Sequence, residues 1–103
     1  MVFMANKYSQ AVYKENSIKF YPQVELDYHN LGVLTIYDIE KLLLEFIEDS
    51  YIQGYKYLLV ITGKGKIIRP LVNKLLKFNE YVSQYNRAGH FNGQDGAIEI
   101  TLK

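Results

Sequence analysis

The sequence predicts a small two-layer α/β sandwich, in which one mixed four-stranded sheet packs against two helices in the order βαβαββ. Three observations support this fold class. Residues 24–29 alternate between apolar and polar side chains, residues 57–61 are continuously apolar, and two further segments repeat apolar residues at helical spacing. With 103 residues, of which 49% are hydrophobic and 22% charged, the chain has the size and composition of one globular domain.

The composition also excludes several classes of protein. The chain has no cysteine, which excludes a disulfide framework, a thiol nucleophile and a cysteine zinc site. Two histidines, His29 and His90, are too few for a histidine-rich metal centre. Apolar runs fall well short of the ~20 residues that a membrane span needs. No signal peptide opens the sequence, so we expect a soluble cytoplasmic protein.

The first regular element is expected just after Pro22. Residues 1–21 show no clean period and are expected to be an N-terminal arm, with the domain spanning residues 22–103. The alternation over residues 24–29 predicts a strand with one packed and one polar face. Its packed face would hold Val24, Leu26 and Tyr28, and its polar face Glu25, Asp27 and His29.

A helix is expected after this strand. Thr35 and Asp38 have the spacing of a capping box, and Gly54 is the natural end of the helix because glycine adopts the left-handed conformation. The predicted buried stripe comprises Ile39, Leu42, Leu43, Phe46 and Ile47.

The second half of the chain predicts a strand, a helix and two more strands. The run 57–61 suits a strand covered on both faces, parallel to the first strand. A helix is expected to begin near Pro70. Its predicted stripe is Ile67, Ile68, Leu71, Val72, Leu75 and Leu76. Residues 81–85 and 97–102 predict two antiparallel strands joined by a loop over residues 89–96.

Two polar segments follow the two parallel strands. Ligands collect at the carboxyl ends of such strands, and paired strands would bring residues 27–30 beside residues 62–65. Asp27 and His29 are two residues apart on one strand face, about 7 Å between their α-carbons. Histidine is the usual proton-transfer group near neutral pH, and a nearby carboxylate can orient it. Two polar residues on a solvated face would show the same pattern.

The glycine loop is suited to anions. Gly63 and Gly65 let the backbone approach a phosphate, and successive amides can point at it beside the start of a helix. Lys64, Lys66 and Arg69 add positive charge. A plain strand-to-helix turn with solvated lysines is the alternative. One Asp and one His are too few protein ligands to support a metal centre, so no cofactor is expected, with a divalent metal left as the open alternative. His90 has no assigned partner.

In this order, the motifs resemble the Smr (small MutS-related) domain family. That family has leucine-aspartate-leucine-histidine-glycine on its first strand, and threonine-glycine-any-glycine after its second. Its next helix often opens with leucine-arginine-proline. Here the corresponding residues are Leu26–Asn30, Thr62–Gly65 and Ile67–Pro70, with Asn30 at the family's glycine position.

The resemblance implies nucleic-acid binding and, as in many members, endonuclease activity that nicks DNA or cleaves RNA. Carried over by position, Asp27 and His29 would be the catalytic pair. Residues Thr62, Gly63, Lys64 and Gly65, with Lys66 and Arg69 beside them, would hold the phosphate backbone. Two alternatives stay open: a non-catalytic module that binds nucleic acid or the ribosome, and a protein-interaction domain that uses a tyrosine-rich surface.

The charge distribution is compatible with a phosphate footprint. The net charge of +1 divides into −4 for residues 1–53 and +5 for residues 54–103. Five cations lie on the glycine loop and the helix after it, with no acid among them: Lys64, Lys66, Arg69, Lys74 and Lys77. A local basic patch on a nearly neutral domain predicts modest, salt-sensitive affinity for nucleic acid.

Overall fold

The computed structural model describes residues 20–89 and 96–103. Their elements are β1 (Val24–Asp27), the short 3-10 helix η1 (Tyr28–Asn30), α2 (Ile36–Ile52), β2 (Tyr57–Ile61), α3 (Ile68–Lys77), β3 (Val82–Arg87) and β4 (Ala97–Leu102). The predicted fold class and element order are therefore confirmed. Most of the expected N-terminal arm and His90 lie outside the described residues.

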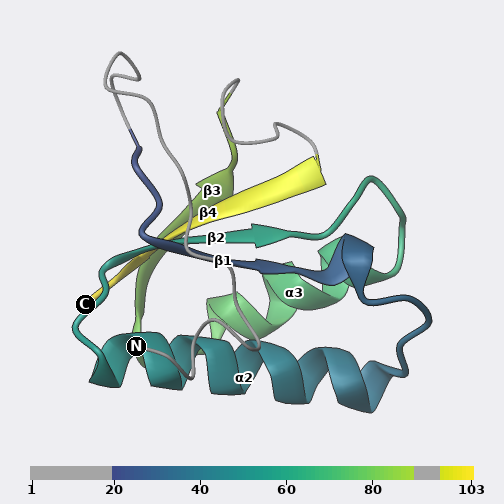
Figure 1. The fold of residues 1–103 in the computed structure, drawn as a ribbon, viewed down its shortest axis with the longest axis horizontal. Helices are drawn as coiled ribbons and strands as arrows, with labels where there is room; N and C mark the ends of the chain where they lie inside the picture. The colour runs from purple at the N-terminus through teal and green to yellow at the C-terminus, as the bar shows by residue number, and fades with distance from the viewer. Residues whose placement is uncertain (1–19, 90–95) are drawn as a thin grey trace.

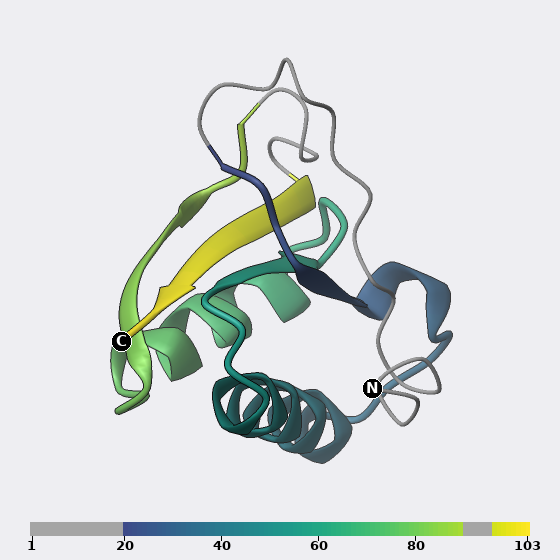
Figure 2. The ribbon, with the colours of Figure 1, turned by 60° about the vertical axis from the view of Figure 1, so that its left-hand side comes forward.

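The four strands form one mixed sheet in the order β1-β2-β4-β3. β1 runs parallel to β2 and β4 runs antiparallel to β3, as predicted, and β4 also runs antiparallel to β2. Both helices lie on the same side of this sheet, so the domain has two layers (Figures 1 and 2). No helix of the described residues is long and apolar enough to cross a lipid bilayer.

The hydrophobic core lies between the helices and the sheet. Val24, Leu26 and Tyr28 point into it and are at most 2% exposed, as their alternation predicted. From α2, four of the five residues of the predicted stripe are buried and Leu42 packs against them half-buried. The full buried set is Val24, Leu26, Tyr28, Ile39, Leu43, Phe46, Ile47, Leu58, Val60, Val72, Leu76, Val82, Ile98, Ile100 and Leu102.

Both predicted ends of α2 are confirmed. The Asp38 amide donates a hydrogen bond to the Thr35 hydroxyl, and the Thr35 amide donates one to the Asp38 carboxylate, each at 3.0 Å. These bonds from Thr35 hold the pKa of Asp38 below its ordinary value. Beyond the helix, Gly54 adopts a φ of +86°, a left-handed conformation that glycine reaches without steric cost.

Three local predictions were wrong. The first strand ends at Asp27 rather than at residue 29, because the Asp27 side chain caps a turn of 3-10 helix. The third strand spans Val82–Arg87 rather than residues 81–85. Ile67 is 71% exposed because it precedes the first turn of α3 and so lies off the apolar stripe. The middle of β2, Leu58 to Val60, is buried on both faces as expected, whereas Tyr57 is 40% exposed and Ile61 is half-buried.

Candidate functional site

The structure brings the two polar segments together at one edge of the sheet. β1 and β2 are parallel and Asp27 pairs in register with Ile61, so both strands end at the same level. The η1 turn continues from β1 at this edge, and the β2–α3 loop, residues 62–67, continues from β2 beside it (Figure 1). The juxtaposition predicted from the sequence is therefore present.

Asp27 organises the η1 turn through both of its carboxylate oxygens. Oδ1 accepts a hydrogen bond from the backbone N–H of His29 at 2.9 Å, and Oδ2 accepts one from Nδ2 of Asn30 at 2.8 Å. Asp27 is thus the N-cap of the 3-10 helix, a common use of aspartate side chains. The expectation that Asp27 and His29 project from one strand face is wrong, since His29 lies on the turn.

The His29 side chain lies against the glycine loop. A Cβ atom placed on Gly63 would be 3.1 Å from Nδ1 of His29, closer than ordinary van der Waals contact. Gly63 also has a φ of +75°, a conformation that side chains other than glycine's rarely adopt. Glycine at position 63 therefore meets both a steric and a conformational requirement. His29 is exposed, so its ring is accessible to a ligand.

Tyr28 fixes the η1 turn to helix α2. Its side chain is 1% exposed, and its hydroxyl donates a hydrogen bond of 2.6 Å to the carbonyl oxygen of Ile39 in the first turn of α2. Burial raises the pKa of the Tyr28 hydroxyl well above its ordinary value, so the group stays protonated and can donate this bond. The sequence predicted the burial of Tyr28 but not this hydrogen bond.

The start of the β2–α3 loop is held by the segment before β4. The backbone N–H groups of Thr62 and Gly63 both donate to the carbonyl oxygen of Gly96, at 2.9 and 3.0 Å. The Thr62 side chain is buried, and its hydroxyl donates to the carbonyl of Gly63. Two of the amides expected to face a phosphate, those of Thr62 and Gly63, are therefore already engaged within the domain.

The charged residues of the loop lie beyond this anchor. Lys64, Gly65 and Lys66 are exposed, whereas Arg69 is half-buried in the first turn of α3. Within residues 20–89 and 96–103, no group of three or more His, Cys, Asp or Glu side chains could hold a metal ion. The edge therefore combines an accessible imidazole, a close glycine backbone and two exposed lysines.

Comparison with known proteins identifies the fold family. The sequence model described as the Smr domain matches residues 26–103, which is most of the chain and includes both polar segments. The chain belongs to the Smr domain family. Two solved structures share its fold: the Smr domain of Thermus thermophilus MutS2 and YdaL, a stand-alone small MutS-related protein from Escherichia coli.

The Thermus structure has a TM-score of 0.68 at 22% sequence identity, and the match covers 77% of this chain and 96% of that one. For YdaL the TM-score is 0.71 at 23% identity, over 92% and 80% of the two chains.

Curated relatives are much longer than this chain. Endonuclease MutS2 of Fusobacterium nucleatum is 32% identical over 97 residues, which cover 91% of this chain and 12% of that protein. Endonuclease MutS2 of Clostridium botulinum (strain Eklund 17B) is 32% identical over 60 residues, covering 57% of this chain and 8% of that protein. The Smr domain described here therefore spans about a tenth of the length of its MutS2 relatives.

Sequence reasoning missed three anchoring hydrogen bonds, those made by Gly96, Tyr28 and Asn30. The carbonyl of Gly96 anchors the β2–α3 loop, the Tyr28 hydroxyl anchors η1, and the Asn30 side chain holds Asp27. Asn30 and Asp27 are close enough in sequence for an Asx-type turn, which the residue types alone could have indicated. The contact of Gly96 joins distant segments, and no local pattern signals it.

Proposed function

We propose that this Smr domain binds nucleic acid at the edge formed by η1 and the β2–α3 loop, and that it cleaves a phosphodiester bond there. The observation that supports the proposal is the position of the exposed His29 imidazole against Gly63, next to Lys64 and Lys66. A proton-transfer group and a cationic loop are thereby close to one another. The name endonuclease carried by the MutS2 relatives supports the same reaction.

In this mechanism His29 takes a proton from the attacking oxygen, which belongs to water or, in RNA, to a ribose 2′-hydroxyl. A new P–O bond forms, the bond to the leaving oxygen breaks, and a proton from His29 or water neutralises that oxygen. Lys64 and the loop amides beyond Gly63 stabilise the negative charge that develops on the phosphate. Asp27 positions His29 through its backbone N–H.

The test is cleavage of labelled plasmid DNA and structured RNA, with and without EDTA, by wild type, His29→Ala and a Lys64→Ala/Lys66→Ala double variant. We expect His29→Ala to lose at least a hundredfold in rate, the typical contribution of general acid–base catalysis being about 10²–10⁴-fold. Lys56→Ala serves as the control, since Lys56 is an exposed lysine at the opposite end of β2. Equal cleavage by His29→Ala and wild type would remove His29 from the mechanism.

A second candidate function is binding without cleavage. It is favoured by the geometry of Asp27, whose two oxygens bond to the His29 backbone and the Asn30 side chain rather than to the imidazole. In that case the wild-type chain retards nucleic acid without cutting it. Binding would persist in His29→Ala and weaken in the Lys64→Ala/Lys66→Ala variant. It would also fall steeply with added salt, because phosphate contacts release counterions.

A further inference from the structure

The solvent side of α3 leads away from the candidate site and carries positive charge. Lys66 lies just before the helix, and Lys74 and Lys77 lie along it; all three are exposed. Residues 64–79 contain no acid. We call Lys66, Lys74 and Lys77 the α3 cationic stripe. It begins in the β2–α3 loop, whose Gly63 lies against His29, and ends at the last turn of α3.

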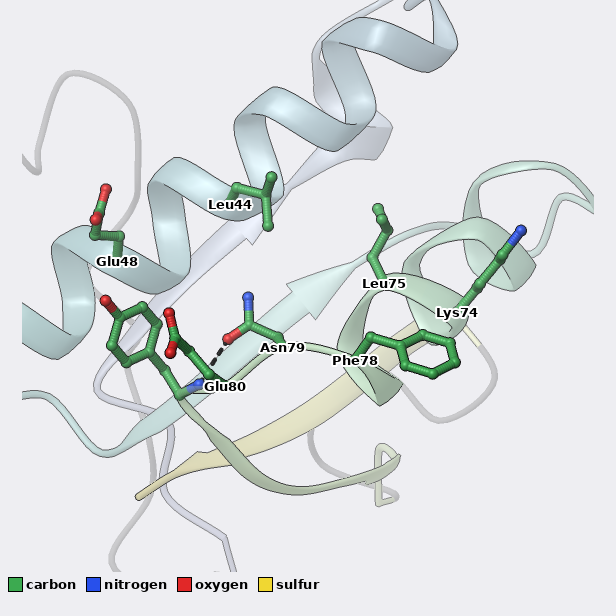
Figure 3. Close-up of a pocket in the computed structure, with 8 residues that line it drawn as sticks. Leu44, Glu48, Lys74, Leu75, Phe78, Asn79 and Glu80 are labelled. Carbon is green, nitrogen blue, oxygen red and sulfur yellow. Dashed lines mark hydrogen bonds between the residues drawn. The ribbon is translucent and has the colours of Figure 1, made fainter.

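An exposed aromatic ring stands at the far end of this stripe. Phe78 is the C-cap of α3 and is 76% exposed, while the core side of the helix is filled by Val72 and Leu76. The ammonium group of Lys77 lies 5.6 Å from the centroid of the Phe78 ring. Figure 3 shows Lys74 and Phe78 projecting from α3, where both line the groove between α3 and α2. The positive charge of Lys77 and the exposed ring of Phe78 therefore lie next to each other at the end of the stripe.

Acidic residues border the other side of Phe78. A groove between α2 and α3 is lined by Leu44, Lys74, Leu75 and Phe78. Its carboxylates are Glu48 on α2 and Glu80 in the turn after α3 (Figure 3). A phosphate backbone is repelled by these carboxylates and attracted by the lysines. The charges therefore favour a polyanion on the α3 side of the groove, along the stripe, over its α2 side.

We propose that a single strand of nucleic acid leaves the candidate site along the α3 cationic stripe and stacks one unpaired base on Phe78. The proposal rests on the function proposed above and adds a substrate class to it. The ten residues of α3 span about 15 Å, which is about four nucleotides at the ~3.4 Å spacing of one duplex strand. A base inside a duplex has both faces covered by its neighbours, so only an unpaired base can stack on the ring.

The experiment measures binding of the full chain to fluorescent 12-nucleotide single strands, DNA and RNA, and to the matching duplexes. Wild type, Phe78→Ala and Phe78→Trp are compared by anisotropy at low temperature, with oligonucleotide integrity checked on a denaturing gel. Tyr37→Ala is the control, because Tyr37 is a 67% exposed aromatic residue on the acidic helix α2. Thermal unfolding confirms that each variant is folded.

We expect Phe78→Ala to weaken single-strand binding about tenfold, equivalent to about 1.4 kcal/mol, and to change duplex binding less than about twofold. Phe78→Trp should retain the affinity, and Tyr37→Ala should match wild type. Equal single-strand affinity of Phe78→Ala and Tyr37→Ala would overturn the stacking site while leaving the proposed function standing. An equal loss for duplexes would overturn the single-strand preference. A wild-type chain that binds no oligonucleotide would overturn the proposed function itself.

Discussion

The imidazole of His29 lies against the backbone of Gly63, with Nδ1 3.1 Å from the position that a Cβ atom on Gly63 would occupy. The two residues come from the ends of different strands, separated by the whole of α2. Asp27 fixes His29 from one side, and the Gly96 carbonyl fixes Gly63 from the other. The backbones of His29 and Gly63 are therefore anchored independently of each other.

Gly63→Ala is expected to displace the His29 ring and to destabilise the domain. The φ of +75° costs an alanine about 1–2 kcal/mol, and its Cβ requires the imidazole to move by a few tenths of an ångström. We expect a lower free energy of unfolding in urea, shifted NMR signals of the His29 ring, and loss of any cleavage activity.

Gly54→Ala is the control that separates the conformational cost of Gly63→Ala from its steric contact with His29. Gly54 has a comparable φ of +86°, but a Cβ atom there meets nothing within 4 Å. Its free energy of unfolding should fall by a similar amount, while the His29 signals stay in place. If Gly63→Ala also leaves those signals unshifted, the contact between His29 and Gly63 has no role in positioning the ring.

Tyr28→Phe tests the anchor between η1 and α2. The substitution keeps the buried ring and removes only the hydroxyl that donates to the Ile39 carbonyl. We expect the free energy of unfolding to fall by about 0.5–1.5 kcal/mol, the net value of a typical hydrogen bond, measured by urea denaturation. Tyr37→Phe is the control, because it removes a hydroxyl from an exposed tyrosine. Equal stability of the two variants would contradict the anchoring role.

The fold could be predicted from the sequence because its signals are local. The alternation of Val24, Leu26 and Tyr28, and the capping spacing of Thr35 and Asp38, each lie within one element and depend on its period or its first turn. In the folded domain, packing between the helices and the sheet buries the apolar faces that these patterns predict. Ile67 departs from the pattern because apolar spacing does not show where a helical turn begins.

The candidate site was predictable only in its approximate location. The parallel pairing of β1 and β2 brings residues 27–30 to the glycine loop, as topology requires. The direction of each group depends on single hydrogen bonds instead. Asp27 turns the chain at His29, and the Gly96 carbonyl takes two amides of the loop. Such side-chain and long-range hydrogen bonds produce no periodic pattern in the sequence, so they could not be predicted from it.

Ser50→Ala is expected to stabilise the domain. Ser50 lies in α2 and is fully buried, and its hydroxyl has no hydrogen-bond partner among the described residues. A buried unpaired polar group costs about 1–3 kcal/mol, and alanine is also the better helix former. We expect the free energy of unfolding in urea to rise by about 1 kcal/mol. Ser83→Ala, at an exposed position in β3, provides the control and should change it little. A loss of stability in Ser50→Ala would show that the hydroxyl has a partner.

Glu25→Gln is expected to stabilise the domain at neutral pH. Burial, with a further contribution from the charge of Asp27, raises the pKa of Glu25 above its ordinary value of 4.5. A raised carboxyl pKa means that the folded state binds the proton more tightly than the unfolded state. The contribution of Glu25 protonation to the free energy of unfolding is fully present below pH 4.5 and is lost as the pH rises through the folded-state pKa of Glu25. The glutamine variant should therefore gain most over wild type near pH 7 and little near pH 3.

Asp38→Asn should show the opposite pH dependence and serves as the comparison. The Thr35 hydrogen bonds lower the pKa of Asp38, so their contribution is present above its ordinary value of 3.8 and is lost as the pH falls through the folded-state pKa. Asp38→Asn should be less stable than wild type at pH 7, with a difference that shrinks in acid. Urea denaturation at pH 3, 5 and 7 measures both variants. Parallel pH profiles for Glu25→Gln and Asp38→Asn would contradict the two assignments, because burial and capping shift a carboxyl pKa in opposite directions.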